Sequence, residues 1–383
     1  MLLLFTIVPP IASGSYISAM PQVMESFAES PGRVQLALTS NLLGMALGQL
    51  AVGPIADRTG RRRPLVVSLA VSVLATLACA VASDLPTLAA ARFLQGVSGA
   101  MGMILASVIA TDALVGRRLL SAFSMMAMVG TVGPIVAPVV GTWWLRFGDW
   151  RGMFVFCAVL SVVCLVASLG LVPETLARGS RVNGGLRTLL SAFGSILRRP
   201  LFLGYGASRG LAYAVVVAFT ASSPFVLRDS LRMTEQEHLV VYSTGALGLC
   251  VVVLLAPAIT VRIGAQTTLL CGFVSSGVGS SLVVLSALTD GPAAVTVAGM
   301  VVALWCLGLI IGTSSGLAME QVRDFAGTGS SVVGGTMFGV GALISMLVAL
   351  GDPGNILSIG LIMLLCGVAG VGVTAGLRTR PRT

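Results

Sequence analysis

The chain has 383 residues, of which 56% are hydrophobic and only 10% charged, and its mean hydropathy is +0.99. A soluble protein of this length would carry about a quarter charged residues, so the composition excludes a soluble enzyme or a soluble binding module. The net charge is +9, but all 23 basic residues are arginine, which excludes the Walker lysine of ATP-driven pumps and any Schiff-base lysine.

The apolar runs, taken in chain order, predict an all-α membrane protein with twelve transmembrane helices. About 20 apolar residues are needed for each crossing of the bilayer, and turn and charge signals separate the runs. The expected helices cover residues 2–20, 34–56, 65–82, 85–111, 119–145, 153–172, 201–226, 239–259, 267–288, 293–319, 328–350 and 356–377.

The longest polar gap, residues 173–200, divides these helices into two sets of six. We interpret it as a cytoplasmic linker between an N-terminal bundle, residues 1–172, and a C-terminal bundle with a short basic tail, residues 201–383. Sixteen arginines fall in the tail and in loops on the linker's side, and five fall in the opposite loops. Because basic residues accumulate in cytoplasmic loops, both termini are expected in the cytoplasm. Because the arginines stand in short clusters between apolar runs, membrane topology and binding to anionic lipid headgroups explain them better than nucleic-acid binding does.

The two halves also share a glycine spacing. The sixteen-residue interval from Gly44 to Gly60 recurs from Gly248 to Gly264, and each interval ends just after an arginine at the inner end of its half's second helix. Fused repeats of six helices are typical of secondary transporters.

The strongest local motif lies between the second and third helices, where residues 53–63 read GPIADRTGRRR. It resembles the signature loop of the major facilitator superfamily, G-x-L-A-D-R-x-G-R-R. Gly60 permits a tight turn, and the arginines hold the loop at the inner face. Arginines that only set topology are the alternative. The resemblance implies a latch for one state of a rocking cycle, formed by Gly53, Asp57, Arg58, Gly60, Arg61 and, at the end of the fourth helix, Asp112.

A second motif lies inside the fourth helix, where residues 91–96 read ARFLQG and resemble the superfamily's R-x-x-Q-G motif. An arginine at membrane depth costs at least ~2.5 kcal/mol on insertion scales, so Arg92 should face a partner or a wet cavity. A coupling or substrate role for Arg92 and Gln95 is the leading interpretation, and a structural arginine is the alternative.

A third motif, GTVGPIVAPVVG at residues 130–141, lies in the fifth helix. Prolines remove backbone donors and small residues permit close packing, so a kink is expected. The string resembles the antiporter motif of proton-coupled drug exporters, although a purely structural kink would look the same. Its key positions are Gly130, Gly133, Pro134, Pro138 and Gly141.

Shorter strings resemble the bicyclomycin- and chloramphenicol-resistance branch of twelve-helix drug:proton antiporters. They lie at residues 16–21, 35–38, 150–154, 173–175, 223–227 and 308–310. That branch carries an acid ahead of the tyrosine that matches Tyr16, whereas this chain has Gly14, which cannot be protonated. No acid is predicted near the middle of any helix. Proton coupling therefore stays open, and Arg92 with Arg209 suits a neutral, zwitterionic or weakly anionic compound better than a cation.

The substrate cavity is expected to be lined by the first, fourth, seventh and tenth helices. Aromatic and thioether side chains tolerate varied apolar ligands, although each could equally pack within its bundle or face lipid. Besides Arg92 and Gln95, the candidates are Tyr16, Met101, Met103, Arg209, Tyr213, Phe219, Trp305 and Thr313.

Metal and cofactor chemistry is not expected. The seven cysteines stand singly in apolar runs without a paired spacing, and His238, the single histidine, is predicted to be solvated in a polar turn. An intramembrane enzyme would need a set such as H-E-x-x-H or paired aspartates at depth, and neither occurs.

The sequence therefore predicts a monomeric exporter of small amphipathic compounds or antibiotics in the inner or plasma membrane. It would work by alternating access, with a proton as the expected counter-ion and no cofactor. The alternative is a dedicated exporter of a metabolite such as an amino acid, a sugar or a self-made antibiotic, which need not be coupled to protons. A non-transporting sensor or assembly partner is a further possibility.

Overall fold

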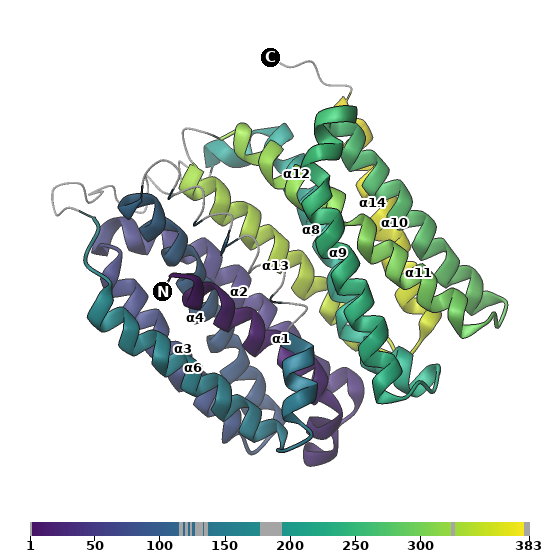
Figure 1. Ribbon diagram of the computed structural model, residues 1–383, viewed down its shortest axis with the longest axis horizontal. Helices are drawn as coiled ribbons and strands as arrows, with labels where there is room; N and C mark the ends of the chain where they lie inside the picture. Colours follow the sequence, from purple (N-terminus) through teal and green to yellow (C-terminus); the bar gives the residue numbers. More distant parts are fainter. Residues whose placement is uncertain are drawn as a thin grey trace. The chain divides into compact units, whose positions relative to one another are not determined.

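The computed structural model describes residues 2–114, 118, 122, 125–126, 133, 137–176, 194–322 and 326–378 (Figure 1). These residues form helices and no strands, and eleven helices are long and apolar enough to cross a membrane. The predicted all-α membrane architecture is confirmed. The fifth predicted span, residues 119–145, lies largely outside the described residues.

The chain forms two compact units, Met1–Ala192 and Phe193–Thr383. In the first unit, α2 packs on α4, α3 packs on both α4 and α6, and α1 contacts α2, α4 and α6. The helices of this unit are α1 (Leu2–Phe27), α2 (Pro31–Thr59), α3 (Arg62–Ala80), α4 (Leu85–Ala113) and α6 (Trp150–Leu171).

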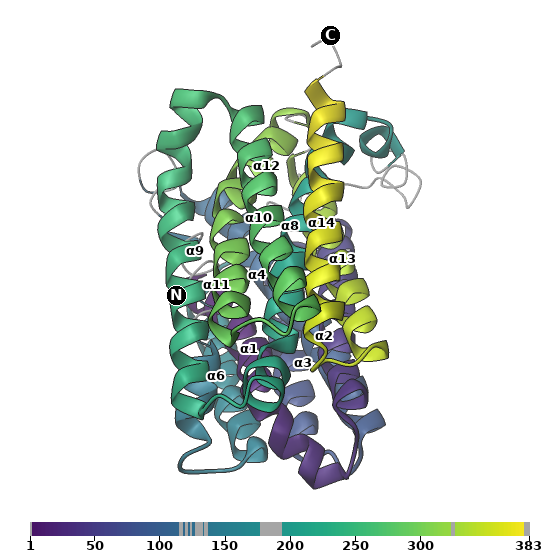
Figure 2. The ribbon, with the colours of Figure 1, turned by 90° about the vertical axis from the view of Figure 1, so that its right-hand side faces the viewer.

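The second unit repeats these pairings. Figure 2 shows α10 between α11 and α14, and both of these neighbours pack on it. The helices are α8 (Pro200–Ser223) with its π-helical continuation η2 (Pro224–Ser230), α9 (Glu235–Ile263), α10 (Ala265–Leu288), α11 (Ala293–Cys306), α12 (Gly308–Glu320), α13 (Ala326–Leu350) and α14 (Ile356–Arg378).

Helix starts follow the local sequence. Asp84 accepts a hydrogen bond of 2.8 Å from the Thr87 backbone N–H and caps α4. This bond stabilises the carboxylate and lowers the pKa of Asp84. Asp149 caps α6 in the same way, and α9 begins with a reciprocal capping box between Thr234 and Glu237.

The glycine repeat marks equivalent helix ends. Gly60 ends α2 with φ 93° and Gly264 ends α9 with φ 85°, a backbone conformation that side chains disfavour. Gly44 and Gly248, at the other end of each interval, lie where a neighbouring helix approaches closely, namely α4 and α11. The repeated spacing thus corresponds to one architectural element built twice.

Most helix ends lie within a few residues of the predicted spans, and two helices differ more clearly. The first span was expected to end at residue 20, but α1 continues through Pro21 to Phe27. Trp150 stabilises the last turns of α1. Its backbone N–H donates to the Gln22 side chain, and its indole N–H donates to the Ser26 hydroxyl. The tenth predicted span is one crossing, Ala293–Glu320, but it is interrupted at Leu307 between α11 and α12.

Candidate functional site

The first unit is built around one completely buried guanidinium. Arg92, on the second turn of α4, has no exposed surface. Its Nη1 donates to the Ala12 carbonyl at 3.1 Å and to Gln95 Oε1 at 2.6 Å, and its Nη2 donates to the Ser13 carbonyl at 3.4 Å. Arg92 therefore ties the middle of α1 to α4.

Two aromatic rings also lie against the Arg92 guanidinium. The Arg92 guanidinium carbon lies 4.6 Å from the centroid of the Tyr16 ring and 5.7 Å from that of Phe154. The negative faces of such rings attract a cation, and the attraction strengthens when the cation is desolvated. Tyr16 is itself fixed, because its hydroxyl donates to the Val34 carbonyl at 2.8 Å. Helices α1, α4 and α6 thus meet at Arg92.

Polar side chains from α2 and α3 complete the cluster. Asn41 Nδ2 donates to the Arg92 carbonyl at 3.0 Å, and Asn41 Oδ1 accepts from the Ser13 hydroxyl at 2.7 Å. Gln95 Nε2 donates to the Thr76 hydroxyl at 2.9 Å. We call Arg92, Gln95, Tyr16, Asn41 and Thr76 the Arg92 cluster. The sequence motif located Arg92 and Gln95, but no spacing pattern pointed to Asn41 or Thr76.

Arg92 forms no hydrogen bond or ion pair with a carboxylate among the described residues. Its Nε also lacks a hydrogen-bond partner among these residues. Gly14, where the resemblance described above implies an acid, is packed closely: a Cβ there would lie 2.5 Å from the Ala137 Cβ of the fifth predicted span. A carboxylate at residue 14 would therefore not fit this conformation. Among the described residues, the charge of Arg92 is balanced by carbonyl, amide and ring dipoles.

The signature loop carries a second polar network at the end of the first unit. Arg61 Nε pairs with Asp112 Oδ2 at 3.3 Å, as the latch hypothesis anticipates. Two residues that sequence reasoning did not assign complete it. Glu174 Oε1 accepts from the Arg61 backbone N–H at 2.8 Å, and the Thr175 hydroxyl donates to Asp112 at 3.0 Å. The start of the linker is thereby bound to the loop.

The other predicted latch residues lie at or near the end of α2, and three of the four are described in full. Gly53 lies within α2, Arg58 is exposed in its last turn, and Gly60 forms the turn after it. The side chain of Asp57 lies outside the described residues.

We expect Asp112→Asn to slow transport several-fold without lowering the amount of folded protein. The Arg61–Asp112 pair is partly exposed, and such pairs contribute only about 0.2–1 kcal/mol to folding. Loss of this pair would therefore change the rate of exchange between transport conformations more than the free energy of unfolding. The measurement is the initial uptake rate per folded protein in everted vesicles. Glu29→Gln, which removes the exposed i,i+4 pair with Arg33, is the matched control. Equal rates for all three proteins would contradict a latch.

The described part of the kink motif packs against α1. The Ser15 and Ser18 hydroxyls donate to the carbonyls of Ala137 and Pro138 at 3.1 and 3.0 Å. A Cβ on Gly133 would lie 2.9 Å from the Pro10 ring, and one on Gly141 would lie 2.9 Å from the Ser15 carbonyl oxygen. Small residues here permit close contact between the two helices. Gly130 and Pro134 lie outside the described residues.

The candidates in the second unit do not form one cluster. Tyr213 packs edge-on against Phe338 of α13 at 5.4 Å, one turn after the half-buried Arg209. Trp305 lies against Gly248, and its indole donates to the Thr244 carbonyl of α9 at 3.0 Å. The Thr313 hydroxyl lies 3.4 Å from that of Thr260, also on α9.

The remaining candidates pack within their own units. Met101 is partly buried against the apolar core of the first unit, around Phe5 and Leu105. Phe219 is buried against Tyr242, with ring centroids 5.7 Å apart. The prediction of a solvated His238 is wrong. Its ring is half-buried in the first turn of α9, 3.4 Å from the Ser223 hydroxyl, because the helix begins earlier than the polar composition suggested.

Comparison with known proteins gives consistent matches along the chain. The family profile described as Major Facilitator Superfamily matches residues 2–346. The uncharacterized MFS-type transporter YdgK of Bacillus subtilis is 27% identical over 369 residues, which cover 96% of this chain and 92% of YdgK. A bicyclomycin resistance protein homolog of Haemophilus influenzae is 24% identical over 349 residues, which cover 90% and 87%.

A solved structure shares the fold. The partially occluded inward open conformation of the xylose transporter XylE from E. coli aligns with a TM-score of 0.75 and 13% identity, covering 96% of this chain and 94% of XylE.

Proposed function

This chain belongs to the major facilitator superfamily, and we propose that it is a secondary active transporter that exports small amphipathic compounds from the cell. The similarity to a bicyclomycin resistance protein homolog supports an antibiotic or similar compound as the substrate. Alternating access of the two units would move it, with the linker and both termini in the cytoplasm. The inner or plasma membrane is the proposed location and a monomer the proposed state.

The Arg92 cluster is the observation on which the proposed substrate class rests. A buried cation without a carboxylate partner raises the electrostatic potential around it and disfavours a second cation nearby. Every Asp and Glu whose side chain is described lies in a loop or in the end turns of a helix. We therefore propose a neutral, zwitterionic or weakly anionic substrate. Arg209, Tyr213, Trp305 and Thr313 are the proposed contributions of the second unit to its recognition.

The counter-ion is the point on which the two candidate functions differ. A drug:proton antiporter needs a group that binds and releases a proton, and Gly14 with its close packing provides none at the usual position. This observation favours a second candidate, an exporter dedicated to one metabolite that moves down its own gradient. Strict saturable selectivity would support that candidate, and a broad profile of exported compounds would support the first.

The test is uptake by everted membrane vesicles across a panel of neutral, anionic and cationic amphipathic compounds, with and without an imposed proton gradient. Uptake that depends on the gradient supports an antiporter. Saturable uptake of one compound regardless of the gradient supports the metabolite exporter. Binding of a compound without any uptake would contradict both and indicate a sensor.

A further inference from the structure

Two small cavities adjoin each other inside the first unit, beside Pro9 of α1. Each has a volume of about 10 Å³. Residues from α1, α3, α4 and α6 line both of them, so they are neighbouring parts of one internal space. The shared lining residues are Val8, Pro9, Ser72, Gly99 and Ser161.

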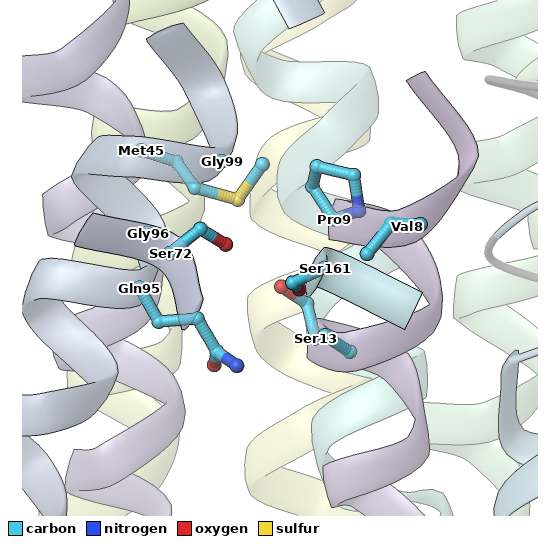
Figure 3. A pocket seen from close by; sticks show the side chains of 10 residues that line it. Val8, Pro9, Ser13, Met45, Ser72, Gln95, Gly96, Gly99 and Ser161 are labelled. Atoms are coloured by element: carbon cyan, nitrogen blue, oxygen red, sulfur yellow. The ribbon is translucent and has the colours of Figure 1, made fainter. Parts of the chain in front are cut away.

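Polar side chains converge on the first cavity. Figure 3 shows Ser72, Ser161, Ser13 and Gln95 around one space, with Met45 at its edge. The Ser161 hydroxyl donates to the Cys157 carbonyl and the Ser13 hydroxyl donates to Asn41, so their oxygen lone pairs remain available as acceptors. The Ser72 hydroxyl makes no hydrogen bond with any described residue, although Ser72 is 9% exposed and lies far inside α3.

The second cavity is lined by Phe5 and Pro9, where the backbone hydrogen bonding of α1 is interrupted. Pro9 has no N–H, so the Phe5 carbonyl one turn earlier cannot make the usual bond. Phe5 and Pro9 both line this cavity, together with Ser98 and Ser72. In membrane helices, ordered water is one of the groups that satisfy carbonyls freed by proline.

We propose that the two cavities bind one ordered water molecule each. A volume near 10–15 Å³ holds a single water, and such a water needs two to four polar partners. The first accepts from the Ser72 hydroxyl and donates to Ser161 and to Ser13 or Gln95. The second donates to the Phe5 carbonyl and to the Ser98 hydroxyl, whose own hydrogen is donated to the Gln95 carbonyl. The waters pair polar groups that Pro9 leaves without a helical partner, and they extend the Arg92 cluster toward Pro9 through Gln95.

Radiolytic hydroxyl-radical labelling of the full-length protein in nanodiscs tests this directly, because bound water generates radicals where bulk water has no access. Met45 lines the first cavity and Cys164 the second, and both sulfur atoms are readily oxidised. The controls are Met363 and Cys366 of α14, which are as deeply buried but line neither cavity. We expect Met45 and Cys164 to be oxidised several-fold faster than their controls. Equal rates would overturn the proposal.

A substitution gives a second, independent readout. A Cβ on Gly102, which lines the second cavity, would meet nothing within 4 Å, so Gly102→Ala fills that space without a clash. If water occupies it, the methyl group displaces a hydrogen-bonded molecule, so the melting temperature falls and Cys164 labelling slows. If the cavity is dry, Gly102→Ala raises the melting temperature at least as much as the control Gly372→Ala, an exposed helical glycine of α14 with open space around it. That rise would overturn the proposal.

Discussion

Replacing Arg92 by lysine or glutamine is expected to reduce the initial rate of substrate uptake tenfold or more. Lysine keeps the charge, but its ammonium group cannot match the planar fork that reaches the Ala12 carbonyl, the Ser13 carbonyl and Gln95 together. Hydrogen bonds to charged groups contribute about 1.5–3 kcal/mol each, and 1.4 kcal/mol corresponds to a factor of ten. Glutamine loses the charge as well as the reach.

The measurement for Arg92 is uptake in everted vesicles, normalised to the amount of folded protein. Arg33→Gln is the control, since Arg33 forms an exposed ion pair with Glu29 at the opposite end of the unit from the signature loop. A further variant, Arg92→Met, separates the roles: methionine fills volume without charge or donors. Wild-type uptake by Arg92→Met would show that Arg92 only packs α1 against α4, and would contradict its proposed part in transport.

Gly96→Val is expected to prevent stable folding of the first unit. A Cβ on Gly96 would overlap the Asn41 carbonyl oxygen, and one on Gly44 would overlap the Phe93 carbonyl oxygen. The backbones of α2 and α4 therefore touch on both sides, and neither carbonyl can move without bending its helix. Overpacking of a close contact costs about 1–3 kcal/mol or more. Separation of the helices would also stretch the 3.0 Å bond from Asn41 to the Arg92 carbonyl.

Thermal melting of the purified protein, with the yield of monodisperse protein, measures the effect of Gly96→Val. The matched control is Gly372→Val on α14, where a Cβ meets nothing within 4 Å. We expect the control to melt like the wild type and Gly96→Val to be recovered poorly or to melt well below it. A wild-type melting temperature for Gly96→Val would show that α2 and α4 separate easily, contrary to the close packing.

The sequence predicts the helical architecture well because each bilayer crossing requires a long apolar run. The limits of α13 and α14 agree with the predicted spans within a few residues. The pattern of apolar runs does not reveal helix ends that depend on tertiary contacts. Pro21 is a stop signal in isolation, yet α1 passes it because Trp150, distant in sequence, holds Gln22 and Ser26.

The sequence allowed us to predict the part of the candidate site that lies on a single helix. Arg92 and Gln95 are three residues apart, so a helix places both on one face. Their partners Asn41, Thr76 and Phe154 come from three other helices. Phe154 lies in the string at residues 150–154, but nothing in the sequence of these segments indicates that the three residues contact Arg92 or Gln95. Glu174 contacts Arg61 across more than one hundred residues of sequence. The string at residues 173–175 gives no indication of this contact.

A buried guanidinium without a carboxylate partner among the described residues should favour uncharged or anionic substrates over cations. The most direct test uses three analogues of one aromatic scaffold that differ only in a terminal amide, carboxylate or quaternary ammonium group. Their competition against an exported reference compound is measured in everted vesicles. We expect the amide and the carboxylate to compete and the quaternary ammonium analogue not to compete. Strongest competition by the quaternary ammonium analogue would contradict this expectation.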